Sequence, residues 1–180
     1  DTVDMRVDSG NWVSINDSSA WSHDWDSAGV NDWRRVITIR SEYSGNYSYD
    51  SIFVNVDNTP PEVLNLWNGN ATTGEPVDIR VMATDLTEVR TVLLNYSING
   101  GAEQSVAPIT LGNDTWEQTL SMPSNATTLS YRFWLEDRMG NGHFTSWVNV
   151  DVVDNDLPWF VEDTTPATAT TDDPFAFAVS

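Results

Sequence analysis

Residues 76–83 read PVDIRVMA, and this stretch decides the fold class. Apolar side chains stand at every second position, at Val77, Ile79 and Val81, and charged side chains stand between them. Successive side chains of a β-strand point to opposite faces of the sheet, so this period of two predicts a strand with one buried face. The fold class follows from how many such stretches surround it.

Six further segments between Pro60 and Asp156 have the length and composition of strands. One of them closes on Asn99-Gly100, a strong hairpin signal because both turn positions favour positive φ. No part of this unit has helical periodicity, so we predict an all-β protein in which seven short strands form an Ig-like β-sandwich. The six segments are residues 62–67, 90–98, 105–111, 115–122, 129–137 and 143–153.

The pattern recurs along the chain at a spacing close to the length of one domain. Trp21 precedes Trp116 by 95 positions, and Asp57 precedes Asp154 by 97. Helical solenoids repeat at much shorter intervals, whereas an immunoglobulin-sized β-domain matches this period. We therefore expect tandem Ig-like domains, one complete and one divided between the two ends of the sequence.

Three domain segments follow from this repeat. Residues 1–58 correspond to an Ig-like domain without its first two strands, and residues 59–156 to a complete one. Residues 157–180 correspond to the first two strands of a further domain. These strands either continue in a longer chain or complete residues 1–58 of a neighbouring subunit by strand addition. The candidate assembly residues are Phe175, Phe177, Val179, Trp159 and Phe160.

The gapless form of the repeat contains one conflict. It places Val36 on Tyr131, yet the neighbouring Ile37 and Ile39 have the pattern of inward-facing residues. We expect a one-residue shift in a loop to reconcile the two segments.

The charge of the chain excludes several kinds of partner. It has 27 acidic residues against eight basic ones, all of them Arg, for a formal charge of −19. Such a surface repels nucleic-acid backbones and anionic lipid headgroups, and no apolar run reaches the roughly 20 residues needed to span a bilayer. The composition is typical of salt-adapted extracellular proteins. Cysteine is absent, so there is no disulfide framework.

Two motifs resemble a known family. DRMGN (137–141) and VDNDLP (153–158) resemble the D-x-x-G-N and DN-x-P signatures of Ig-like repeats in archaeal or bacterial surface proteins. TVDMRVDSGNW (2–12) and WSHDWDS (21–27) look like the third strand of that repeat and the Trp-rich strands after it. The resemblance implies a cell-surface location and a role as a stalk, surface-layer component, adhesin or enzyme appendage.

The acidic junctions resemble the linkers of cadherin repeats, which implies Ca²⁺ between domains. Ca²⁺ takes six to eight oxygen ligands, and carboxylates from two domains can supply them. The alternative is ordinary turn chemistry, in which Asp and Asn bond their own backbone. Asp85 is expected near the same end of the unit as Asp137. The candidate ligands are Asp57, Asn58, Asp154, Asn155, Asp156, Asp137 and Asn141.

Six N-x-S/T sequons are candidate N-glycosylation sites. Three of the asparagines fall in predicted turns, whereas Asn95 lies inside a predicted strand and would have to face outward. The six are Asn16, Asn46, Asn70, Asn95, Asn113 and Asn125.

Motifs for catalysis are missing from the sequence. His23 and His143 are the only histidines, and no cysteine, nucleophile elbow or phosphate-binding loop occurs. We therefore expect a non-catalytic extracellular structural protein: a surface layer, stalk or filament. One alternative is a filament subunit in which residues 157–180 complete residues 1–58 of the next copy. Another is an adhesin or carbohydrate-binding module with glycans as partners.

Overall fold

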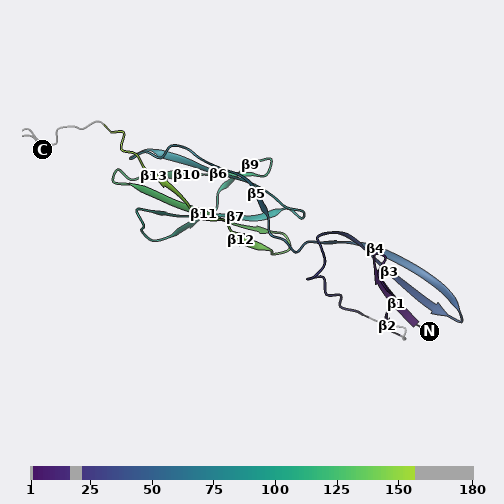
Figure 1. Ribbon diagram of the computed structural model, residues 1–180. Coiled ribbons are helices and arrows are strands. Elements are labelled where there is room, and N and C mark those ends of the chain that lie inside the picture. Colours follow the sequence, from purple (N-terminus) through teal and green to yellow (C-terminus); the bar gives the residue numbers. More distant parts are fainter. Residues whose placement is uncertain (1, 17–21, 157–180) are drawn as a thin grey trace, which may run out of the picture.

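The computed structural model describes residues 2–16 and 22–156, and every regular element in this part of the chain is a β-strand. Figure 1 shows two groups of strands joined by one linker. We call residues 2–56 the first unit, residues 57–61 the linker and residues 62–151 the second unit. The all-β prediction is confirmed. Among the described residues, no helix is long and apolar enough to cross a membrane.

The second unit is a sandwich of two antiparallel sheets. One sheet has the order β5 (Glu62–Asn68), β6 (Pro76–Thr84), β10 (Thr115–Ser121), β9 (Ile109–Gly112). The other has the order β12 (Gly142–Phe144), β11 (Thr128–Asp137), β7 (Val89–Ile98), β8 (Gln104–Val106), and β13 (Val148–Asp151) also pairs with β11. An A-B-E-D sheet facing a C-F-G sheet is the immunoglobulin arrangement, so the unit is Ig-like.

The core of the second unit lies between these sheets. The apolar side of β6 faces the apolar side of β11, as the alternation in both strands predicts. The side chains of Ile79, Val81, Leu129, Phe133 and Leu135 are fully buried.

Two of the expected strands are each divided. Residues 105–111 contribute β8 to one sheet and β9 to the other, and Pro108, which has no N–H to donate, lies between them. Residues 143–153 divide at Thr145, whose hydroxyl accepts the Phe133 N–H in place of a backbone carbonyl. The sandwich therefore has nine strands rather than the seven predicted.

The first unit is a single sheet in the part of the chain that is described. Its strands are β1 (Thr2–Val7), β2 (Val13–Asn16), β3 (Trp33–Tyr43) and β4 (Asn46–Val56), in the order β2-β1-β3-β4. Residues 22–32 contain no strand, contrary to the expected Trp-rich strands there. The reason is local: Asp26 accepts the Ala28 N–H, and Ser27 accepts the Val30 N–H, so this segment turns.

Hydrogen bonds fix the correspondence between the two units. The N–H of Asp8 donates to the carbonyl of Val36 over 2.8 Å, and the N–H of Asn99 donates to that of Thr128 over 3.0 Å. The side-chain oxygens of Asp8 and Asn99 accept the N–H groups of Val36 and Thr128 in return. Val36 therefore corresponds to Thr128 and not to Tyr131.

The expected one-residue shift is accordingly wrong, because the offset here is 92 positions and not 95. The Gly-Asn pair follows nine residues after Val36 but twelve after Thr128, so the second unit has three more residues before its turn. With this offset, Ile37 and Ile39 correspond to Leu129 and the inward-facing Tyr131. Both isoleucines thus lie on the inner face, as their pattern indicates.

Candidate metal site at the junction

The linker between the units is hydrogen-bonded to the first unit through Asn58 and Thr59. The Asn58 side-chain amide donates to the carbonyls of Ser27 and Val30, both over 2.9 Å. The Asn58 N–H and the Thr59 hydroxyl donate to the two carboxylate oxygens of Asp32, over 2.7 Å and 2.5 Å. These bonds lower the pKa of Asp32, with the Thr59 hydroxyl contributing most.

Three carboxylates meet where the linker reaches the second unit. Asp57 directly follows β4, Asp85 directly follows β6, and Asp137 is the last residue of β11. One oxygen from each lies within 4.8 Å of the others. Asp137 is fully buried and Asp57 is 7% exposed. The site forms because β6 and β11, in facing sheets, both end at the edge of the sandwich next to the linker.

Two polar side chains hold these carboxylates in place. The Thr87 hydroxyl lies 2.5 Å from Asp57 Oδ2 and 3.0 Å from Asp85 Oδ1, so its single O–H can donate to either carboxylate. The Asn141 amide donates to Asp137 Oδ2 over 2.7 Å and to the backbone carbonyl of Asp57 over 3.1 Å. Asn141 therefore ties the loop after β11 to the linker.

The cluster carries negative charge that no described cation balances. None of the six ion pairs among the described residues involves Asp57, Asp85 or Asp137. Burial raises the pKa of Asp85, and the nearby carboxylates of Asp57 and Asp137 add to the rise against hydrogen bonds from Thr87. Like charges about 5 Å apart repel by about 3 kcal/mol at an effective dielectric constant of about 20.

The geometry fits a calcium ion. Ca²⁺ binds oxygen at about 2.3–2.6 Å, so two oxygens that share one ion lie at most about 5 Å apart. The three carboxylate oxygens meet this limit, and carboxylates are the ligands that Ca²⁺ prefers. Asp57, Asp85 and Asp137 could therefore hold Ca²⁺, with the Thr87 hydroxyl beside them.

The other candidate ligands lie elsewhere. Asn58 binds the first unit, as described above, and the 154–156 stretch lies at the other end of the second unit. There the Thr73 hydroxyl donates to Asp154 over 3.2 Å and to Asp156 over 3.4 Å, and the Asn155 amide contacts Glu75 over 3.4 Å. The structure thus brings Asp57, Asp137 and Asn141 together and leaves Asp154, Asn155 and Asp156 apart. Sequence reasoning missed Thr87, whose only signal is its place two residues after Asp85.

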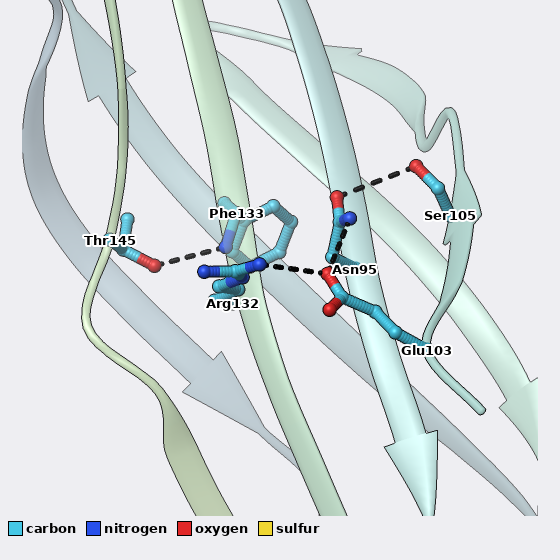
Figure 2. Close-up of polar contacts among 6 residues, drawn as sticks. All are labelled: Asn95, Glu103, Ser105, Arg132, Phe133 and Thr145. Carbon is cyan, nitrogen blue, oxygen red and sulfur yellow. Dashed lines mark hydrogen bonds and ion pairs between the residues drawn. The ribbon is translucent and has the colours of Figure 1, made fainter. Parts of the chain in front are cut away.

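The sequon asparagines differ in how free their side chains are. The Asn95 amide is half-buried in β7 and donates to Glu103 over 2.8 Å, as Figure 2 shows. The side chain of Asn16 and the assembly candidates Trp159, Phe160, Phe175, Phe177 and Val179 lie outside the described residues. The exposed sequon asparagines are Asn46, Asn70, Asn113 and Asn125.

The outer face of the second unit carries an arginine between aromatic rings. The Arg132 guanidinium lies 3.9 Å from the ring centre of Phe144 and 4.5 Å from that of Trp147. It also pairs with Glu103 over 2.9 Å, the same carboxylate that Asn95 binds (Figure 2). Such stacking stabilises a sheet face and orders its side chains.

The first unit has the same arrangement at the corresponding position. With the offset of 92, Arg40 corresponds to Arg132, and its guanidinium lies 4.3 Å from the Trp12 ring centre and 5.1 Å from that of Tyr47. Arg40 pairs with Asp4 over 2.8 Å. The outer-face stack is therefore a repeated feature of the two units, and the sequence comparison did not reveal it.

Comparison with known proteins gives limited similarity. No protein-family model and no curated protein matches the chain. Among solved structures, the carbohydrate-binding module BhCBM56 is 26% identical, with a TM-score of 0.38 over 48% of this chain and 90% of that one. The FN1–FN3 domains of chicken CNTN1 are 9% identical, with a TM-score of 0.44 over 84% of this chain and 55% of theirs.

A Ca²⁺-stabilised, ice-binding adhesin of an Antarctic bacterium is 14% identical, with a TM-score of 0.41 over 86% of this chain and 40% of that one. Similarities this low carry no inference about ligand or activity. The Ig-like assignment rests on the strand order of the second unit.

Proposed function

We propose that the protein is a non-catalytic extracellular structural protein of a cell surface, in which Ig-like units act in series as a spacer stiffened by Ca²⁺ at their junction. The observation that carries this proposal is that Asp57, from the linker, shares one cluster with Asp85 and Asp137 of the second unit. An ion bound by all three would tie the linker to the sandwich. The linker is also tied to the first unit through Asn58, so the joint would resist bending.

The charge of the chain agrees with this setting. A formal charge of −19 with arginine as the only basic residue suits a surface exposed to salt and divalent cations, which screen its self-repulsion. Extracellular calcium modules bind with dissociation constants of about 10⁻⁴–10⁻³ M, matched to the ion concentration outside cells.

Calcium titration by isothermal calorimetry tests the proposal. We expect the Asp85→Asn/Asp137→Asn double variant to bind one ion fewer per chain than the wild type. Asp151→Asn removes an exposed carboxylate at the end of β13, away from the cluster, and should leave that site intact. Equal binding by wild type and double variant would refute a calcium site at the junction.

A second candidate function is glycan binding by the outer face of the first unit. The rings of Trp12, Tyr49 and Tyr47 follow one another with centres 6.1 Å and 6.3 Å apart, and Tyr49 is 61% exposed. This row of rings, of which Tyr47 and Tyr49 are exposed, lies beside Arg40 and Asp4 and offers both an apolar surface and hydrogen-bonding groups to a sugar.

A glycan array tests this candidate, since it requires binding that Tyr49→Ala abolishes. Phe53→Ala, which removes an equally exposed ring on the same face of β4, is the matched control. Absence of binding to any glycan, or binding that survives Tyr49→Ala, would leave the outer-face stack with a structural role alone.

A further inference from the structure

The inner face of the first unit is mainly apolar and only partly covered by the described residues. Cross-strand pairing places Met5 opposite Ile39 and Ile37 opposite Ile52, so these four side chains share one face. They line a groove of about 390 Å³ together with His23, Trp25, Asp50 and Ser51. Ile52 is 57% exposed, which is unusual for an isoleucine at the centre of a long strand.

The second unit shows what covers the equivalent surface. Ile37 and Ile39 correspond to Leu129 and Tyr131, which are 0% and 1% exposed. Those two side chains pack in one cluster with Val77, Ile79 and Val81 of β6. The groove in the first unit therefore lies where a strand equivalent to β6 would pack.

The chain contains a segment with the pattern of that strand. Residues 174–179 read PFAFAV, and residues 76–81 read PVDIRV, so Phe175, Phe177 and Val179 stand where β6 has its three inward residues. Alanines replace the two charged residues between them, which leaves the segment without charge. The segment 157–180 has 24 residues, and β5 with β6 spans residues 62–84, so it is long enough for both strands.

We propose that residues 157–180 of one copy of the chain cover the inner face of the first unit of a second copy, with Phe175 and Phe177 in the groove beside Ile37 and Ile39. The recognition combines backbone pairing by an added strand with apolar side chains in a preformed groove. Figure 1 shows β13, the last strand of the described chain, toward the end of the second unit that faces away from the linker and the first unit.

A contact between two different surfaces of the same molecule is heterologous, so it builds a head-to-tail filament unless the rotation between copies closes a ring. Each copy would accept a segment at its first unit and donate one from beyond its second unit. This inference names the partner of the structural protein proposed above and rests on that proposal. It does not depend on the calcium site.

Sedimentation velocity on the full chain over a range of concentrations tests the inference. We expect the wild type to form polymers that lengthen with concentration. Phe175→Asp/Phe177→Asp should abolish them by removing the donor, and Ile52→Asp should abolish them by blocking the acceptor. Thr170→Asp/Thr171→Asp adds the same charge to the same segment outside the strand pattern and should leave the polymers unchanged.

Mixing the two defective variants gives the sharpest outcome. The donor-defective chain keeps its groove and the Ile52→Asp chain keeps its segment, so together they should form a one-to-one complex that grows no further. A synthetic peptide of residues 157–180 should shorten wild-type polymers, and this measurement needs no substitution in the folded chain.

Three results would overturn the inference. If the wild type stays monomeric at every concentration, the groove is covered by a segment of the same chain or of a longer chain and not by a second copy. Polymers that survive both the donor and the groove substitutions would place the contact elsewhere. Failure of the two defective variants to pair, with both folded by near-ultraviolet circular dichroism, would also contradict it. Asp85→Asn/Asp137→Asn should still polymerise, so loss of the calcium site and loss of assembly are separable.

Discussion

Replacing Asp85 with Asn should change the stability of the second unit in opposite directions with and without calcium. In the absence of the ion, Asp85 faces Asp57 and Asp137, with one oxygen of each within 4.8 Å. Repulsion between unit charges at about 5 Å is about 3 kcal/mol at an effective dielectric constant of about 20, and partial protonation relieves some of it. Because of this relief, we expect Asp85→Asn to stabilise the ion-free unit by about 1–2 kcal/mol. The asparagine oxygen can still accept the Thr87 N–H.

With calcium bound, the sign reverses because the wild type gains binding energy that the variant loses. At a free calcium concentration about 100 times the dissociation constant, a site of this kind stabilises the folded state by about 2.7 kcal/mol. In a domain of this size, 1 kcal/mol shifts Tm by about 4–8 °C. The wild type should therefore unfold at least 10 °C higher with calcium than with EDTA, a shift of about 10–20 °C, whereas Asp85→Asn should hardly respond.

Differential scanning calorimetry of the full chain, in EDTA and in calcium, measures the stability under both conditions. Asp151→Asn, which removes an exposed carboxylate away from the cluster, should behave as the wild type does in both buffers. Equal destabilisation of Asp85→Asn in the two buffers would refute the reasoning, because neither relief of charge repulsion nor loss of calcium binding would account for it.

Three further outcomes follow from individual side chains. Phe133→Ala should cost about 3–5 kcal/mol in urea denaturation because its ring is fully buried, whereas Phe53→Ala, at 63% exposed, should cost under about 1 kcal/mol. In EDTA, the pKa of Asp85 is higher in the folded protein than in the unfolded chain, so the folded state binds the proton more tightly. The stability of the wild type should therefore rise as pH falls from neutral through that pKa. A plot of Tm against pH for Asp85→Asn should lack this rise. Glu88→Gly should stabilise the unit by up to about 1 kcal/mol in urea denaturation. Glycine adopts the φ of 93° found at Glu88 without strain, and the ion pair that is lost, with Arg138, is exposed. A loss of stability would show that this ion pair outweighs the backbone strain.

Period-two alternation was enough to predict the sandwich, because β6 and β11 each have one face in the core and one in solvent. Single side chains that form turns or interrupt strands account for the features that this alternation did not predict. The Asx turn at Asp26 prevents a strand that the tryptophans around it favour, and Thr145 and Pro108 divide strands whose composition is continuous. The predicted alignment of the two units was wrong because a gapless comparison does not allow for the three extra residues that precede the turn in the second unit.

The junction was predictable only in part. Asp57 and Asp137 stand in recognisable motifs, and Asp85 ends a strand that runs toward the same edge. The role of Thr87 depends on how a short loop folds back on the linker, which no pattern in the sequence encodes. The opposite is true of Asp154: it matches Asp57 by motif, but among the described residues no further sandwich meets it.

The stiffness of the joint tests the central claim most directly. The chain has no cysteine, so spin labels can be placed at Ser48→Cys in β4 and Ser124→Cys after β10, both at exposed positions. Pulsed electron–electron double resonance should give one narrow distance distribution in calcium that broadens in EDTA, and no calcium effect in the Asp85→Asn/Asp137→Asn background. Distributions of equal width with and without calcium in the otherwise wild-type chain would contradict a calcium-stiffened junction.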